Sequence, residues 1–409
     1  MIVPAINPDR LLGDLYALRR IGAYKTGVHR PTLSPDDLVS RQWLVERMKE
    51  AGLDAEIDGI ANVLGKSRAG GRKILAGSHI ESQNHAGWLD GALGVIYALE
   101  AARALRDDPS TRDLGVDVIA FCDEEGHFGS YLGSRSFIGD VTEAEIDRAR
   151  DRTHGRMMRD ALQQAGYAGR PRLTVEPGRY AGYFEAHIEQ GRTLETAQLK
   201  IGVVTAIVGL WDYRLKVTGH QNHAGTTTMA ERRDAGMTLI RLIAAIDQKF
   251  KQLTGPRSVW TCGRIEFDPG APSVIPGEAR ALLQFRDPDR AILDRLEAAL
   301  HAEVVAFNAA GPCSIAVETI RQSKPAVMDE KFQQAIEASA AIHAPGKATR
   351  MPSGAGHDAQ HVARAMPAAM LFVPSIDGIS HHWAENTSDE DIVLGARVFT
   401  DAIASVLKG

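Results

Sequence analysis

The chain has 409 residues, of which 44% are hydrophobic and 24% charged, a composition typical of a folded globular protein. Its length exceeds what one hydrophobic core usually serves, which predicts two domains or one domain with a large insertion. The net charge of -5 argues against nucleic acid as a partner. No apolar run approaches the roughly 20 residues that span a bilayer, and the amino terminus lacks the pattern of a signal peptide, so a cytoplasmic protein without a membrane partner is expected.

Cysteine usage restricts the metal chemistry that is open to this chain. Cys122, Cys262 and Cys313 lie far apart and form no C-x-x-C pair, which excludes a zinc ribbon and a disulfide framework. Any bound metal must therefore use histidine and carboxylate ligands.

The first half of the chain reads as alternating strands and helices. An amphipathic helix is expected over residues 36–51, buried strands over 73–77 and 116–122, and a helix between them over 91–105. A strand, a helix and a second strand in this order predict a crossover in a largely parallel sheet.

Polar residues follow both predicted strands, where ligands bind in such sheets. His79 and Glu81 come after the first strand, and Glu124 and Glu125 come after the second. Adjacent carboxylates at the end of an apolar strand repel each other unless a cation or a proton compensates them.

The pattern changes near residue 207 and changes back near residue 327. Expected elements are an alternating strand over 213–218, a helix over 237–253, a strand over 280–286, a strand-like stretch over 366–374 and a helix over 389–407. We therefore predict an α/β fold with a mixed, largely parallel sheet flanked by helices, carrying an inserted smaller α+β domain. One domain is expected at 1–206 and 327–409, and the inserted domain at 207–326.

The candidate metal ligands are imidazoles and carboxylates, the donor set that suits zinc and its first-row neighbours when thiolates are absent. They are His79, Asp90, Glu125, His187 and His381. One carboxylate can bridge two ions, so this set is compatible with a two-metal site.

Several blocks in order make the sequence recognisable. They are Gly77-Ser78-His79, Asp90 to Val95, Asp123-Glu124-Glu125-Gly126, His187 to Gly191, His223 to Thr227, Ser353 to Ala359 and Gly378-Ile379-Ser380-His381. Over nearly its whole length the chain resembles the amidohydrolase branch of the co-catalytic metallopeptidase superfamily, which includes N-carbamoyl-L-amino acid hydrolases, allantoate amidohydrolases and β-ureidopropionases.

This resemblance implies a centre of two divalent ions per subunit. Asp90 would bridge them, His79 and His187 would complete one site, and Glu125 and His381 the other. Zn²⁺ is favoured, and Mn²⁺, Co²⁺ or Ni²⁺ would suit the same ligands.

The resemblance also implies roles for two further residues in the reaction. Glu124 would be the general base that generates a metal-bound hydroxide and passes the proton to the leaving nitrogen. The resemblance makes 1–206 and 327–409 the metal-binding catalytic domain, and 207–326 a dimerisation or lid domain that pairs subunits into a homodimer. His223, from this inserted domain, would stabilise the oxyanion.

Substrate contacts are implied by the same resemblance. Arg286 would hold a substrate carboxylate through its two-pronged donor geometry. Further contacts are expected from Gln190, Gly354, Ala355, Gly356 and His357, with glycine allowing main-chain N–H groups to approach an anion closely. The expected partner is thus a small amide that carries a carboxylate.

The sequence departs from the family pattern at two positions. Glu81 stands where aspartate is common, and it would orient His79 or its metal with a longer side chain. Ser273 stands where an asparagine commonly helps to hold the substrate, and serine has a shorter reach and no amide N–H₂. His85 and Trp88 shape either a pocket for an unsaturated or aromatic substrate or the packing of their loop.

Three hypotheses follow for the function. The first is metal-dependent hydrolysis of the linear C–N amide bond of an N-carbamoyl-L-amino acid or a similar small N-acyl acid. The second keeps the mechanism but acts on allantoate, a ureido acid or an amide from heterocycle or aromatic catabolism. The third is a non-catalytic relative that binds a small ligand.

Overall fold

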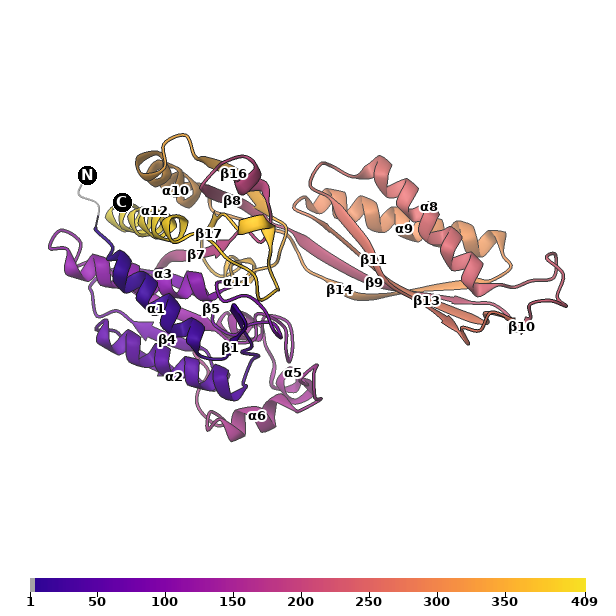
Figure 1. The fold of residues 1–409 in the computed structure, drawn as a ribbon, viewed down its shortest axis with the longest axis horizontal. Helices are drawn as coiled ribbons and strands as arrows, with labels where there is room; N and C mark the ends of the chain where they lie inside the picture. The colour runs from indigo at the N-terminus through magenta and orange to yellow at the C-terminus, as the bar shows by residue number, and fades with distance from the viewer. Residues whose placement is uncertain (1–3) are drawn as a thin grey trace. The chain divides into compact units, whose positions relative to one another are not determined.

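The computed structural model describes residues 4–409, which divide into two compact units (Figure 1). The first unit comprises residues 4–205, 327–351 and 357–409, and the second comprises 206–326 and 352–356. The two units meet in the chain at residues 205/206 and 326/327, and the domain boundaries expected from the sequence lie within one residue of these positions. Residues 352–356 differ from the expectation, since they belong to the second unit and not to the first. Residues 1–3 belong to the amino-terminal segment in which no signal peptide was expected, and they lie outside the described residues.

A nine-stranded sheet forms the centre of the first unit. Its strands are β3 (Asp54–Ile57), β4 (Val63–Lys66), β5 (Lys73–His79), β6 (Val116–Phe121), β7 (Tyr180–Ile188), β8 (Ile201–Ile207), β15 (Ala326–Val327), β16 (Ala348–Ser353) and β17 (Ala368–Val373). They follow the order β15-β8-β17-β7-β5-β6-β4-β3, with β16 paired to β8. Strands β6, β5, β7 and β17 run parallel, and β8, β4 and β3 join antiparallel. The predicted mixed, largely parallel sheet is confirmed.

Helices flank this sheet in the first unit (Figure 1). They are α1 (Pro8–Arg20), α2 (Pro35–Glu50), α3 (Ala92–Asp107), α4 (Leu132–Phe137), α5 (Glu143–Arg148), α6 (Met158–Gln164), α7 (Thr193–Thr196), α10 (Glu330–His343), α11 (Asp358–Val362) and α12 (Asp389–Lys408), with a short hairpin β1 (Ala23–Tyr24) and β2 (Gly27–Val28) and a 3₁₀ turn η1 (Ile376–Gly378). Helix α3 is buried from Ala92 to Leu105, because it packs on the sheet on one side and on α1 and α12 on the other. Most of its residues are apolar, and its buried charged residues Glu100 and Arg103 pair with Arg10 and Asp14 of α1.

The register of the strands brings the candidate ligands to one edge of the sheet. His79 is the last residue of β5 and pairs with Phe121, the last residue of β6. His187 lies at the carboxyl end of β7, opposite Phe372 of β17. Parallel strands end at the same edge, so residues that follow them in the sequence become neighbours in space.

The second unit is an antiparallel sheet with two helices on one face (Figure 1). It contains β9 (Gly209–Thr218), β10 (Asn222–His223), β11 (Val259–Asp268), β12 (Val274–Ile275), β13 (Glu278–Asp287), β14 (Ser314–Gln322), α8 (Ala235–Leu253) and α9 (Arg290–Ala310). The main sheet has the order β11-β13-β9-β14. Along β9, Trp211, Tyr213, Leu215 and Val217 are buried while the residues between them are more exposed, which confirms the predicted alternating strand.

Among residues 4–409, no helix combines the length and the apolar character that crossing a membrane requires.

Candidate functional site

The five predicted metal ligands come together at the carboxyl edge of the large sheet. They form two groups that share Asp90: His79, Asp90 and His187 in one group, and Asp90, Glu125 and His381 in the other. Within each group the ligand atoms lie within 4.8 Å of one another. His381 is the exposed member, and the other four side chains are buried.

The two oxygens of Asp90 face different groups. Oδ1 lies 3.0 Å from His187 Nε2 and 3.6 Å from His79 Nε2. Oδ2 lies 3.4 Å from His381 Nε2, which in turn lies 3.8 Å from Glu125 Oε2. A carboxylate that presents one oxygen to each of two ligand groups has the arrangement required to bridge two cations.

Backbone carbonyls orient the two buried imidazoles. Nδ1 of His79 lies 3.1 Å from the carbonyl oxygen of Glu81, and Nδ1 of His187 lies 2.9 Å from that of Ile188. An Nδ1–H that donates to a carbonyl leaves the lone pair of Nε2 available for a metal. Within residues 4–409, the buried Nε2 of His79 has no hydrogen-bond partner, so its environment fits a divalent cation.

The site concentrates negative charge away from water. Burial and the neighbouring Glu125 raise the pKa of Glu124 well above its usual range, and burial and Asp90 raise the pKa of Glu125 to about 8. Burial also opposes ionisation of Asp90, but its hydrogen bonds with His187 and His381 outweigh burial and hold its pKa well below the usual range. Divalent cations would relieve the mutual repulsion of these carboxylates.

Glu124 and Glu125 are aimed by a tight turn after β6. Asp123 adopts the left-handed conformation, with φ of 63°, and its carboxylate accepts the N–H groups of Phe128 and Gly129 at 3.0 and 2.7 Å. Beyond this turn, Glu124 Oε2 lies 3.5 Å from His79 Nε2. The candidate base therefore borders the metal ligands. Left-handed residues that are not glycine are concentrated at functional sites.

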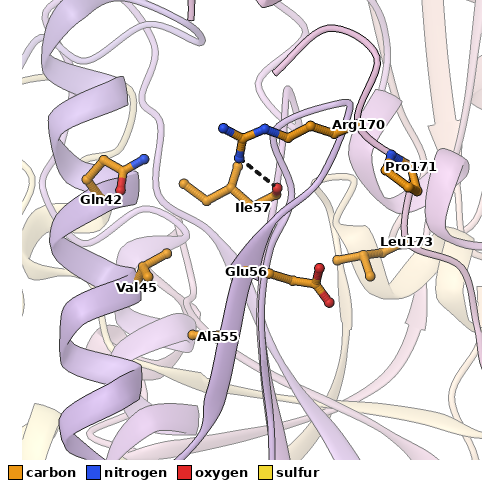
Figure 2. Close-up of a pocket in the computed structure, with 8 residues that line it drawn as sticks. All are labelled: Gln42, Val45, Ala55, Glu56, Ile57, Arg170, Pro171 and Leu173. Atoms are coloured by element: carbon orange, nitrogen blue, oxygen red, sulfur yellow. Dashed lines mark hydrogen bonds between the residues drawn. The ribbon is translucent and has the colours of Figure 1, made fainter. Parts of the chain in front are cut away.

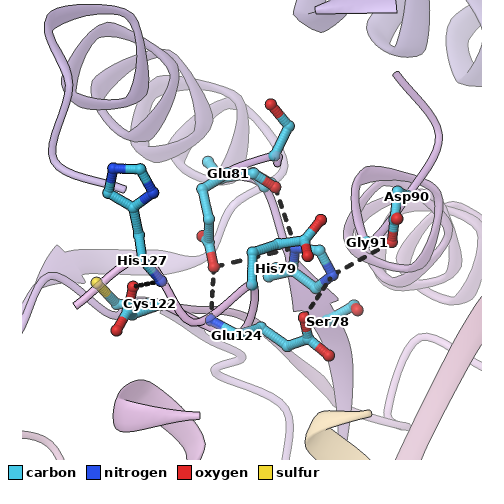
Figure 3. A network of polar contacts seen from close by, with 12 residues as sticks. Ser78, His79, Glu81, Asp90, Gly91, Cys122, Glu124 and His127 are labelled. Carbon is cyan, nitrogen blue, oxygen red and sulfur yellow. Dashed lines mark hydrogen bonds and ion pairs between the residues drawn. The ribbon is translucent and has the colours of Figure 1, made fainter. Parts of the chain in front are cut away.

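The side chain of Glu81 reaches past His79 (Figure 3). Its Oε1 lies 4.0 Å from His79 Nδ1 and accepts the backbone N–H of Glu124 at 2.7 Å. Its Oε2 accepts a hydrogen bond from Arg41 at 2.7 Å, and both of these side chains are fully buried. The carboxylate is thus too far from His79 for a hydrogen bond, and the predicted role of Glu81 in orienting His79 or its metal stays a prediction. The Glu81 carbonyl holds the imidazole, and the carboxylate holds the backbone of Glu124.

Gln190 lies within the ligand cluster. Its Nε2 donates to Asp90 Oδ2 and to Ser380 Oγ, both at 3.0 Å, and its backbone adopts a left-handed φ of 58°. This side chain thus contacts the shared carboxylate, and its predicted contact with substrate stays a prediction.

The predicted oxyanion donor, His223, lies in the second unit on β10. Its Nδ1 accepts the backbone N–H groups of Gly225 and Thr226 at 3.0 and 3.2 Å. An Nδ1 that accepts hydrogen bonds leaves the proton on Nε2, which makes the exposed imidazole a donor. Ser273 is its neighbour, because β10 pairs with β12 and the Ser273 carbonyl accepts the N–H of Ala224 at 2.9 Å.

Arg286 lies near the end of β13 beside the segment 352–356. Its Nε donates to Gln284 Oε1 at 2.8 Å, and its Nη1 donates to the carbonyl of Gly354 at 3.0 Å. The N–H of Ala355 is bonded to Ser353 Oγ at 3.1 Å. At Gly354 it is the carbonyl that makes the contact with Arg286, and the predicted contacts of Gly354, Ala355 and Gly356 with substrate stay predictions. Gly356 closes this segment.

His357 belongs to the first unit and lies against His187, a candidate metal ligand. Its buried ring is 4.6 Å from that of His187 in an edge-on arrangement. Burial and the neighbouring His187 hold the pKa of His357 well below its usual range, so its imidazole stays neutral. A role in binding substrate remains a prediction.

The aromatic residues of the loop before Asp90 have different environments. Trp88 is buried and stacks on Tyr16 of α1 with ring centroids 5.4 Å apart, while the guanidinium of Arg19 covers it. Trp88 therefore serves loop packing. His85 is exposed, with its ring 4.1 Å from that of Tyr24.

A separate hollow lies between α2, β3 and residues 170–173 (Figure 2). Arg170 crosses it and donates a hydrogen bond to the carbonyl of Ile57 at 3.2 Å. The hollow is lined by Gln42, Val45, Ala55, Glu56, Ile57, Arg170, Pro171 and Leu173. None of these is a predicted site residue, and none is a histidine, so the chemistry is assigned to the edge of the sheet.

Three residues of the site were not singled out in the sequence. Arg41 and Glu385 are buried charged residues, and Ser380 directly precedes His381. Glu385 offered one signal, since it follows His381 by four residues in a polar segment. Arg41 offered none, because an arginine on an amphipathic helix is ordinarily exposed.

Comparisons with known proteins cover nearly the whole chain. A model of peptidase family M20/M25/M40 matches residues 76–405. The N-carbamoyl-L-amino acid amidohydrolase of Geobacillus stearothermophilus is 31% identical, covering 99% of this chain and 100% of that protein. The allantoate amidohydrolase of Bacillus subtilis (strain 168) is 30% identical, covering 90% and 91%. The crystal structure of an amidase of the hydantoinase/carbamoylase family from Burkholderia phymatum has a TM-score of 0.93 at 47% identity, covering 100% and 99%.

Gly91 offers a test of the ligand cluster. A Cβ at this position, where φ is 67°, would lie 2.4 Å from the imidazole of His79. We expect Gly91→Ala to weaken Zn²⁺ affinity at least about 10-fold, because the ring must move. Gly166→Ala is the control, since φ there is 72° and nothing lies within 4 Å of the added carbon. Both variants bear the strain of about 1–2 kcal/mol that a left-handed alanine costs. Equal Zn²⁺ affinity of the two variants in calorimetric titrations would contradict the assignment.

Proposed function

Since the chain belongs to peptidase family M20/M25/M40 and is an amidohydrolase, a hydrolase of carbon–nitrogen bonds other than peptide bonds, we propose that it cleaves the linear amide bond of an N-carbamoyl-L-amino acid or a similar small N-acyl acid. The catalysis is metal-dependent. This class sets aside the hypothesis of a non-catalytic binding relative. The presence of two ions per subunit, their identity as Zn²⁺, a homodimer formed through the second unit and a cytoplasmic location remain predictions.

The observation that carries the proposal is the position of Asp90 between two ligand groups, with Glu124 beside them. In this proposal His79 and His187 hold one ion, Glu125 and His381 hold the other, and Asp90 is shared. The unpartnered Nε2 of His79 supports it, as does the Nε2 of His187, which lies 3.0 Å from Asp90 Oδ1 and accepts the Gly91 N–H at 3.1 Å, since both nitrogens lie beside the shared carboxylate.

Bound divalent ions would supply Lewis-acid polarisation and lower the pKa of a water molecule. The protein supplies the proton transfers. Glu124 takes a proton from the attacking water and delivers it to the leaving nitrogen, which would otherwise depart as a poor amide anion. His223 donates from Nε2 to the oxyanion as charge develops on the carbonyl oxygen.

The substrate class in this proposal depends on Arg286. A guanidinium binds a carboxylate through two parallel N–H groups, which favours substrates that carry an acid next to the scissile amide. Gln284 and Gly354 already hold two of its nitrogens in place, so the side chain is oriented before substrate binds. The Geobacillus stearothermophilus relative, named for N-carbamoyl-L-amino acids, supports this class.

A second candidate keeps the mechanism and changes the substrate to allantoate or another ureido acid. Ser273 favours it, because its hydroxyl lacks the N–H₂ donors of the asparagine that the family commonly has at this position. The Bacillus subtilis relative is named as an allantoate amidohydrolase. Amides from heterocycle or aromatic catabolism belong to the same alternative.

The general base is tested by substitution in the metal-loaded protein. We expect Glu124→Gln to lower kcat by about 10²- to 10⁴-fold, since the amide cannot accept a proton. Its metal content, measured by atomic emission, should match that of the parent protein. The adjacent Glu125→Gln should lose metal as well as activity. Chelation should abolish activity in the parent, and Zn²⁺, Mn²⁺, Co²⁺ or Ni²⁺ should restore it. Activity that survives metal depletion would refute the proposal.

The substrate is tested by ammonia and amine release from a panel of N-carbamoyl-, N-formyl- and N-acyl-L-amino acids together with allantoate. We expect the highest kcat/KM with an N-carbamoyl-L-amino acid. Preferential turnover of allantoate would instead establish the second candidate, and exclusive turnover of carbamoyl-amino acids would exclude it.

Arg286 is tested with matched substrates. Arg286→Lys should raise KM for an N-carbamoyl-L-amino acid by about 10- to 100-fold, because lysine cannot form the paired hydrogen bonds. The methyl ester of the same compound has no carboxylate, so its KM should change less than threefold, by the same reasoning. Equal effects on the acid and the ester would show that Arg286 does not bind the carboxylate.

A further inference from the structure

Glu385 holds the loop that carries Asp90. It follows His381 by four residues, and only 1% of its surface is exposed. Its Oε1 accepts the backbone N–H groups of Leu89 and Asp90 at 3.2 and 3.1 Å. One buried carboxylate oxygen therefore contacts the backbone of the residue that both ligand groups share.

A second set of contacts links the same carboxylate to the side chain of Asp90. Glu385 Oε2 accepts the hydroxyl proton of Ser380 at 2.8 Å. Ser380 Oγ in turn accepts from Gln190 Nε2 at 3.0 Å, and that nitrogen also donates to Asp90 Oδ2 at 3.0 Å. Glu385 thus reaches Asp90 both through its backbone and through its carboxylate.

The same contacts reach the second ligand group. Ser380 directly precedes His381, whose backbone is left-handed with φ of 53°. A residue in that conformation needs its surroundings to hold it. The bond between Ser380 and Glu385 fixes the start of this segment, so Glu385 connects Asp90 and His381, which are far apart in the sequence.

The surroundings of Glu385 suit an acceptor that carries no proton of its own. Leu89 N–H, Asp90 N–H and Ser380 O–H all donate to it. Glutamine would place an N–H₂ group against at least one of these donors. The carboxylate of Glu385 also packs closely against Gly87, since a Cβ at Gly87 would lie 1.9 Å from Oε1 of Glu385.

We infer that Glu385 is a positioning residue of the metal centre, which keeps the two oxygens of Asp90 turned toward their separate ligand groups. The inference rests on the metal centre of the proposed function and is independent of the substrate.

The test compares Glu385→Gln with Asp117→Asn in the full-length, metal-loaded protein. Asp117 is also fully buried and accepts a backbone N–H, from Ser67, and a bond from Arg179, but it lies near the start of β6, away from the ligands. Zn²⁺ affinity is measured by competition with a chromophoric chelator, without substrate. We expect Glu385→Gln to bind Zn²⁺ about 10- to 100-fold more weakly and Asp117→Asn to stay within threefold of the parent. Equal affinity of Glu385→Gln and parent, or equal weakening in both variants, would overturn the inference.

A second variant keeps the test decisive if Glu385→Gln does not fold. Ser380→Ala leaves the carboxylate in place and removes its link to Gln190. In the Co²⁺-loaded protein, we expect this variant to change the visible absorption spectrum, because Gln190, which donates to Asp90 Oδ2, loses the contact with Ser380 that orients it. An unchanged spectrum would overturn the inference. Failure of the parent protein itself to bind Zn²⁺ or Co²⁺ would refute the metal centre, whereas failure to hydrolyse carbamoyl-amino acids would affect only the proposed substrate.

Discussion

The carboxylate of Asp90 is the group on which the rest of the site depends. Its two oxygens face two different pairs of side chains, at 3.0 and 3.6 Å on one side and 3.4 Å on the other. Asp90 lies just before α3, the helix buried from Ala92 to Leu105 against which the sheet, α1 and α12 pack. Because a core helix cannot shift without opening a cavity, the packing of the first unit also fixes the geometry of the shared ligand.

Buried charge shapes the surroundings of this carboxylate. Burying an ionised acidic group in the protein interior, where the dielectric constant is low, costs free energy unless cations or hydrogen-bond donors compensate its charge. Glu81 is compensated by Arg41 and by the N–H of Glu124, and Glu385 by three donors. The raised pKa values of Glu124 and Glu125 show where compensation by protein groups is incomplete. That is the place where a divalent cation would have the largest effect.

The two units divide the work in the proposed reaction. The first carries the candidate metal ligands and Glu124. The second carries Arg286, Ser273 and His223, which are proposed to hold the substrate and its oxyanion. Changes in the second unit, such as serine for asparagine at position 273, are thus expected to alter the substrate and to leave the bond-breaking chemistry unchanged.

The sequence by itself determined where several of the helices and strands lie, that the sheet is largely parallel, and which histidines and carboxylates follow the strand ends, whereas elements such as α1, α9, α10, β11 and β14 were not predicted. These are local properties, since hydrophobic periodicity and strand length depend on neighbouring residues. The reach of Glu81 to Arg41, the packing of Trp88 on Tyr16 and the support of Asp90 by Glu385 were decided by the tertiary structure alone. They join positions as many as 296 residues apart, and several act through backbone N–H and carbonyl groups, which every residue carries and which no sequence pattern therefore reveals.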